Sequence, residues 1–253
     1  MYLYMLQDHV LNMPGQEWRM RPENDEAKEF LNRAARTLVK HQYPETTRES
    51  EPKESLFKFT RSMAIGPQQE YIVRVLDMPG EWFQYPEKAI GADGTNILQK
   101  YLRDSQGLLC LVDPDSPEDE PMIAYLTQLL NDLYMQTRPY KVDKWLAFCL
   151  TKMDLPQHRP HLNDPASYVK QKLGSLIVTR ILDYCQPGRV RFDYACSAVG
   201  YYHRPNGNQL SPERSNSGID WFGQNIIYEV KHIRPFGLFE PLQWLFENGV
   251  GRV

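Results

Sequence analysis

Three short polar motifs each follow an apolar run, and this arrangement constrains the fold of the chain more than any other feature of its sequence. The motifs are Asp77-Met-Pro-Gly80, Thr151-Lys152-Met153-Asp154 and Ser197-Ala198. In an open α/β sheet, ligands lie at the carboxyl ends of the strands, so functional side chains come directly after apolar runs. We therefore expect the three motifs to project from one sheet edge toward one ligand.

The second half of the chain predicts alternating strands and helices. Strands are expected at 107–112, 145–150 and 190–195, and helices at 94–104, 118–136, 165–184 and 239–247. This alternation favours parallel pairing. The predicted fold class is α/β, with a three-layer, mostly parallel sheet flanked by helices.

The first part of the chain predicts two helices and a pair of strands. The helices are expected at 1–11 and 25–40, with Phe30, Leu31, Ala34, Ala35, Leu38 and Val39 on the apolar face of the second. Alternating strands at 56–61 and 71–76 are expected to form an antiparallel ribbon at a sheet edge.

Polar segments at 43–52 and 200–218 predict loops. We predict a single domain over 1–253, with a helical region at 1–42, the motif-bearing core at 43–200, and a polar loop and closing helix at 201–253.

The net charge and the composition argue against a nucleic-acid-binding protein and a membrane-spanning protein. The net charge of −3 gives no basic field for nucleic acid, and no apolar stretch is long enough to span a membrane. The four cysteines form no C-x-x-C pair, which predicts buried free thiols in a cytoplasmic protein without a zinc site. We expect the prolines around His158-Arg-Pro-His161 to make a solvated loop.

The order and placement of the motifs resemble the later nucleotide-binding motifs of a P-loop GTPase of the Ras-like, translation-factor-related class. The resemblance covers about 43–200 and extends to the closing Phe239-Glu-Pro-Leu-Gln-Trp-Leu-Phe246 helix. It is strongest toward bacterial double-GTPase families. It implies GTP or GDP and Mg²⁺ as cofactors, and a protein effector or a second GTPase domain as partner.

The resemblance assigns the phosphate side of the site to the first motif and the loop before it. Asp77 would hold Mg²⁺ through a water, and the Gly80 N–H would contact the γ-phosphate. Thr46 or Thr47 would close over the metal, and we prefer Thr46. Glu81 stands where a Ras-like enzyme has a water-orienting Gln, which predicts slow hydrolysis or a solvated turn residue.

The other two motifs would recognise the base. Asp154 would accept both N–H groups on the Watson–Crick edge of guanine, and Lys152 would lie along the base and ribose. Thr151, where this class more often has Asn, keeps a hydroxyl for bracing loops, and Ser197 and Ala198 would offer a backbone N–H to the guanine oxygen. The alternative is a turn before a proline-broken loop.

The phosphate-binding loop, G-x-x-x-x-G-K-[ST], is missing, because Gly-Lys occurs nowhere in the sequence. In the Ras-like arrangement, the strand before that loop lies between the strands ending at Asp77 and Val112. One hypothesis is that the sequence starts late and the full protein is a GTP hydrolase acting as a switch. The others are a degenerate pseudo-GTPase that scaffolds proteins, and an unrelated α/β protein with accidental motifs.

Overall fold

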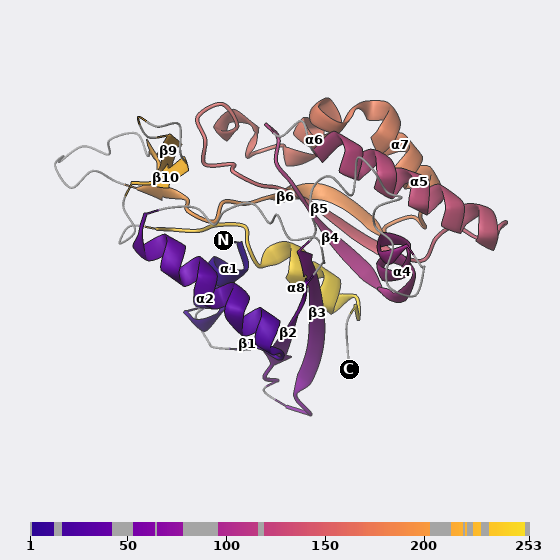
Figure 1. Cartoon of the computed structure of the whole chain (residues 1–253). Coiled ribbons are helices and arrows are strands. Elements are labelled where there is room, and N and C mark those ends of the chain that lie inside the picture. Colours follow the sequence, from indigo (N-terminus) through magenta and orange to yellow (C-terminus); the bar gives the residue numbers. More distant parts are fainter. Residues whose placement is uncertain are drawn as a thin grey trace.

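A computed structural model describes residues 2–12, 17–41, 53–63, 65–77, 96–115, 119–202, 214–219, 221, 225–228 and 233–250. Four of the residues assigned above to phosphate binding and catalysis lie outside these ranges, namely Thr46, Thr47, Gly80 and Glu81. Within the described ranges, two main sheets are joined by packed helices (Figure 1).

The parallel sheet has the order β4-β5-β6, formed by Gly107–Val112, Trp145–Leu150 and Val190–Ala195. These bounds confirm the three strands that the sequence predicts. Along the central strand β5, Leu146, Phe148 and Leu150 belong to one buried cluster, whereas Ala147 and Cys149 belong to another. Side chains alternate between the faces of a strand, so both faces of this sheet are covered.

Helices supply the two outer layers around the parallel sheet. They are α4 (Ile97–Asp104), α5 (Asp119–Thr137), α6 (Pro165–Leu173), α7 (Ser175–Tyr184) and α8 (Glu240–Glu247). Figure 1 shows α5, α6 and α7 together on one side and α8 on the other. The chain is therefore α/β with a three-stranded parallel sheet flanked by helices.

The prediction of one helix over 165–184 is wrong. Gly174 has a φ of 84°, which a right-handed helix cannot continue, and α7 begins at the next residue. The break lets α6 pack on β6 and α7 pack on α5.

The second sheet is antiparallel, with the order β1-β2-β3. Pairing of β2 (Lys53–Arg61) with β3 (Gln69–Asp77) confirms the predicted antiparallel ribbon. Its predicted place at a sheet edge is wrong for β2, because β1 (Trp18–Pro22), a strand not predicted from the sequence, pairs on the other side and makes β2 central. The signal for β1 was the alternation of buried Trp18 and Met20 with exposed arginines.

Two predicted helices precede and follow β1, at Tyr2–Leu11 (α1) and Asp25–Val39 (α2). The Asn24 side chain caps α2 by accepting from the Ala27 N–H at 3.0 Å, and it also donates to the Glu54 carbonyl at 2.7 Å. This double contact fastens α2 to β2. Val39 is 79% exposed, so its assignment to the apolar face was wrong.

Helix α8 packs its aromatic side chains on the antiparallel sheet. Phe246 stacks on Tyr71 with ring centroids 4.5 Å apart, and Phe239 meets Trp18 edge-on at 5.1 Å. The buried cluster that contains these rings also contains Ala147 of β5. Apolar packing through α8 therefore connects the two sheets.

Four very short strands lie beyond β6: β7 (Tyr201–Tyr202), β8 (Arg214–Ser215), β9 (Ser217–Ile219) and β10 (Asn225–Ile227). They form the antiparallel pairs β7–β8 and β9–β10. The prediction of a plain loop over 200–218 is wrong at its two described ends, while 203–213 lies outside the described residues.

Two general features complete the fold. None of the described helices is both long and apolar enough to cross a membrane. All four cysteines are free, with Cys149, Cys185 and Cys196 buried and Cys110 half-buried.

Candidate functional site

The Thr151–Asp154 motif is fastened to the strands on both sides of β5. The Thr151 N–H and hydroxyl both donate to the Val112 carbonyl, at 2.8 and 3.2 Å, so Thr151 braces the end of β4. On the other side, the Met153 N–H donates to the Cys196 carbonyl at 3.2 Å. The motif therefore spans the carboxyl ends of all three parallel strands.

Lys152 has a backbone conformation that is rare outside glycine, with a φ of 55°. Such a conformation costs about 1–2 kcal/mol and persists where the surroundings fix it, often at functional sites. The Lys152 ammonium forms an ion pair with the carboxylate of Asp113, the residue directly after β4. Its side chain is 55% exposed, so this cation is available to solvent and to a ligand.

Asp154 is a buried carboxylate surrounded by serine hydroxyls. Its Oδ1 accepts from the Ser197 hydroxyl at 2.5 Å, and its Oδ2 accepts from the Ser215 hydroxyl. The Ser217 hydroxyl lies 3.3 Å from the same Oδ2 and 2.8 Å from the Ser215 oxygen. Asp154 is only 2% exposed, so in this conformation no ligand reaches the carboxylate.

Ser197 organises the end of β6 through both its side chain and its backbone. Its Oγ accepts from the Val199 and Gly200 N–H groups at 3.2 and 2.8 Å. Its backbone N–H donates to the Phe236 carbonyl at 3.0 Å. This N–H, which the resemblance assigns to the guanine oxygen, is therefore already used within the protein, whereas Ala198 is half-buried beside it.

The short strands beyond β6 close over Asp154. The Tyr201 hydroxyl donates to the Met153 carbonyl at 3.2 Å, and the Arg159 guanidinium lies 4.8 Å from the Tyr201 ring centroid. The Asn216 N–H donates to the Gly200 carbonyl at 3.0 Å, which places Ser215 and Ser217 against the carboxylate. We call residues 214–219 the cover.

A second polar cluster follows β4 and contains a histidine that the sequence analysis placed in a solvated loop. His158 is instead fully buried, with Nε2 2.9 Å from Asp115 Oδ2 and Nδ1 2.7 Å from the Tyr168 hydroxyl. An ionised carboxylate only accepts, so Nε2 donates to Asp115, while Nδ1 shares a hydrogen bond with the Tyr168 hydroxyl. His161 stacks on Tyr168 at 3.9 Å.

The charge balance at Asp115 favours its ionised form. Burial raises the pKa of Asp115, but hydrogen bonds from Gln157 and His158 and the charges of His158 and Lys172 outweigh it and hold the pKa below its ordinary value. The Asp115 carboxylate thus links the loop after β4 to the loop after β5 and to α6.

Of the first motif, only Asp77 lies within the described residues. Asp77 is the last residue of β3, in the antiparallel sheet, and the described strands do not join that sheet to β4–β6. Among the described residues, direct contacts join the second and third motifs, whereas residues 78–80 of the first lie outside the described ranges. Within the described ranges, no three side chains of the metal-binding types gather into a metal site, and Thr46, the other predicted Mg²⁺ ligand, lies outside them.

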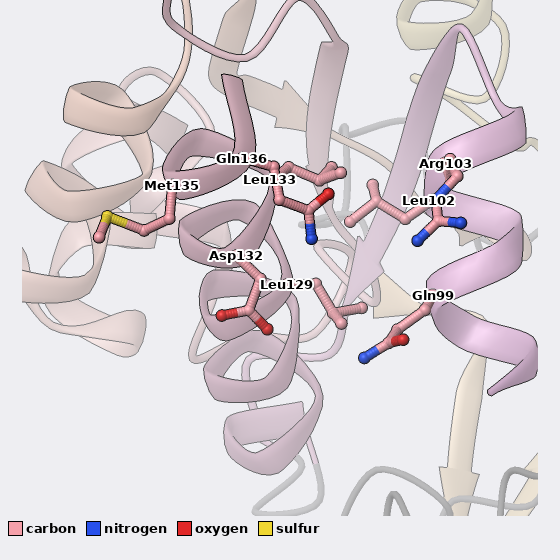
Figure 2. Close-up of a pocket in the computed structure, with 8 residues that line it drawn as sticks. All are labelled: Gln99, Leu102, Arg103, Leu129, Asp132, Leu133, Met135 and Gln136. Carbon is pink, nitrogen blue, oxygen red and sulfur yellow. The ribbon is translucent and has the colours of Figure 1, made fainter. Parts of the chain in front are cut away.

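A surface groove of about 340 Å³ lies between α4 and α5. Figure 2 shows Gln99 and Leu102 of α4 facing Leu129 and Leu133 of α5, with Met135 pointing away. Its lining residues are Gln99, Leu102, Arg103, Leu129, Asp132, Leu133, Met135 and Gln136. No predicted site residue is among them, so this groove is separate from the corner at Asp154.

Comparison with known proteins gives no further identification. No protein-family model, curated protein or solved structure matches the chain. The candidate site therefore depends on its own geometry.

Sequence reasoning missed several residues of this corner. Asp113 and Asp115 follow the apolar run 107–112 just as Asp77 follows the run 72–76, so the rule that found the motifs also applies to them. Ser215 and Ser217 carry no such signal, because they lie in a polar segment without periodicity.

Proposed function

We propose that the protein binds guanine nucleotides and acts as a molecular switch of P-loop GTPase ancestry, Ras-like and most similar to double-GTPase families. The observation that carries the proposal is the hydrogen bond between Ser197 and Asp154, which joins two predicted base-recognition motifs 43 residues apart. They meet at the carboxyl end of a parallel sheet, the usual place for ligands in α/β proteins.

The chemistry of the corner favours guanine over adenine. Asp154 offers two acceptor oxygens to the two N–H donors on the Watson–Crick edge of guanine, a charge-assisted contact worth about 1.5–3 kcal/mol. Adenine presents the wrong donor pattern there. Lys152 would lie along the base and ribose, Thr151 braces the loop, and the Ala198 N–H takes the guanine oxygen, since Ser197 has donated its own to Phe236.

The sheet edges support the same ancestry. The resemblance places one more strand between β3 and β4, and each of these is an edge of its sheet among the described strands. Mg²⁺ would be held by Asp77 and Thr46, Gly80 would contact the γ-phosphate, and Glu81 in place of Gln would make hydrolysis slow. Free thiols fit a cytoplasmic protein, with an effector or a second GTPase domain as partner.

The proposal is tested by calorimetric titration of GTP, with ATP as control and Mg²⁺ present, into the purified protein. Binding should be selective for GTP, and Asp154→Asn should weaken it and shift preference toward xanthine nucleotides. Asp183→Asn removes an exposed carboxylate on α7 and is the matched control. Equal binding of GTP and ATP, or an Asp154→Asn variant that binds GTP like the control, would contradict base recognition at this corner.

A second candidate function is a pseudo-GTPase that serves as a protein-binding module. It is favoured by the burial of Asp154, whose two oxygens already hold serine hydroxyls. This candidate predicts no GTP binding and no GTP-dependent change in the native protein. The same titration separates the two.

A further inference from the structure

We propose that the cover, residues 214–219, is an autoinhibitory segment that competes with the guanine base for Asp154. The inference rests on the proposed function. Ser215 donates to the Asp154 oxygen that a guanine N–H would need, and Ser217 lies beside it. With Asp154 2% exposed, the base can enter only when the cover moves away.

The serine hydroxyls of the cover are hydrogen-bond donors of the same kind as the N–H groups of guanine. A serine O–H and a guanine N–H are both uncharged donors to an ionised carboxylate, so exchanging one for the other keeps the carboxylate hydrogen-bonded. Ser197 belongs to the end of β6 and is held there by Phe236, so it remains when the cover leaves. The competition therefore falls on Ser215 and Ser217.

The cover is held by few backbone contacts, which suits a segment that must be displaced. Its pairing with β7 spans two residue pairs, and its pairing with β10 spans three. The Asn216 N–H donates to Gly200, and the Asn216 carbonyl accepts from the Tyr228 N–H at 3.0 Å. Such short two-stranded pairs are marginally stable, unlike the central strand β5.

The cover also reaches the end of α2. Strand β10 pairs with the cover, and its Ile227 N–H donates to the His41 carbonyl at 3.0 Å, while His41 Nδ1 lies 3.1 Å from the Ile227 carbonyl. Figure 1 shows β9 and β10 beside this end of α2. Displacement of the cover would therefore act on the contact between β10 and the end of α2.

The test compares GTP affinity in the Ser215→Ala/Ser217→Ala double variant, the parent protein and Ser175→Ala, which removes an exposed hydroxyl at the start of α7. The double variant should bind GTP about tenfold more tightly, since two competing donors are lost. Ser175→Ala should bind like the parent. Hydrogen exchange of the parent should show GTP exposing the Asn216 and Tyr228 amides while β5 stays protected, a readout that needs no variant to fold.

The outcomes separate the cover from the proposed function. Suppose that GTP binds and Asp154→Asn weakens binding, but the double variant binds no more tightly and exchange at Asn216 is unchanged. The autoinhibitory role of the cover is then overturned, and base recognition by Asp154 stands. Weaker binding by the double variant also overturns this role, because the hydroxyls would then assist Asp154. If neither the parent nor the double variant binds GTP, both the proposed function and the autoinhibitory role of the cover are wrong.

Discussion

Two carboxylates follow neighbouring strands at the same end of the parallel sheet, but their surroundings are opposite. Asp154, after β5, is 2% exposed, and its described partners are serine hydroxyls. Asp115, after β4, has a side chain 43% exposed and contacts His158 and Lys172. One carboxylate is buried among neutral donors, and the other is partly solvated among groups that carry or can take positive charge.

The difference lies in how each carboxylate is stabilised. A carboxylate buried among neutral partners depends on their hydrogen bonds to offset the cost of its desolvation. Asp154 has the hydroxyls of Ser197 and Ser215 for this. Asp115 instead has its charge balanced by its neighbours and fastens two loops to α6, so we assign it a structural role.

The largest expected effect is on the backbone that shapes the Asp154 corner. Gly200 has a φ of 61°, and a Cβ added there would lie 1.8 Å from the Arg234 carbonyl oxygen. Gly200→Ala should lower the free energy of unfolding by about 3 kcal/mol or more, measured by urea denaturation. Gly188→Ala is the matched control, with a φ of 79° but no atom within 4 Å of the added Cβ, and should cost about 1 kcal/mol. Equal losses in the free energy of unfolding would show that the backbone around Gly200 shifts at little cost to make room for the added Cβ.

The next largest effect comes from replacing each of the two carboxylates, Asp154 and Asp115, with the uncharged Asn. Asp154→Asn should destabilise the protein by about 1–3 kcal/mol, since the amide keeps only one of the two oxygens that accept from the buried serine hydroxyls. Asp115→Asn should cost less than about 1 kcal/mol, because its site is partly solvated and the amide oxygen can still accept from His158. Chemical denaturation of both variants measures the difference. A larger loss of stability in Asp115→Asn than in Asp154→Asn would contradict this difference between the two carboxylates.

A smaller effect concerns acid stability. The pKa of Asp115 lies below its ordinary value of 3.8 in the folded protein, so as the pH falls the unfolded chain takes up a proton first. The stabilisation from Asp115 is therefore complete above that value and is lost as the pH falls through the lower folded pKa. The stability difference between the parent and Asp115→Asn should shrink from about pH 5 to about pH 3. A constant difference over that range would contradict ionic stabilisation.

The smallest effect tests the backbone of the Thr151–Asp154 motif. At Lys152, with a φ of 55°, Gly should be more stable than Ala by about 1 kcal/mol. At Lys170, an exposed residue of α6, the order should reverse, because Gly is about 1 kcal/mol less favourable than Ala in a helix. Thermal unfolding of the four variants gives both differences. The same order at both positions would show that Lys152 does not hold this conformation in solution.

Local sequence patterns predicted much of the framework. The strands β4, β5 and β6 have the bounds that the sequence predicted. In β4 and β5 the signal is a continuous apolar run, which is typical of strands covered on both faces. In the edge strand β6, apolar residues alternate with Arg191 and Asp193. The helix break at Gly174 was not predicted, because it depends on the backbone conformation of a single glycine. The strand β1 was not predicted, because it has only five residues.

The candidate site was predictable only in part, and the separation of its residues explains why. The sequence by itself determined that polar motifs follow β5 and β6, because apolar periodicity marks where a buried strand ends. Tertiary structure decided the environment of Asp154, whose partners Ser215 and Ser217 lie 61 and 63 residues away along the chain. It also buried His158 against Asp115, 43 residues earlier. Contacts over such distances depend on how whole segments pack, and no local pattern of residues specifies them.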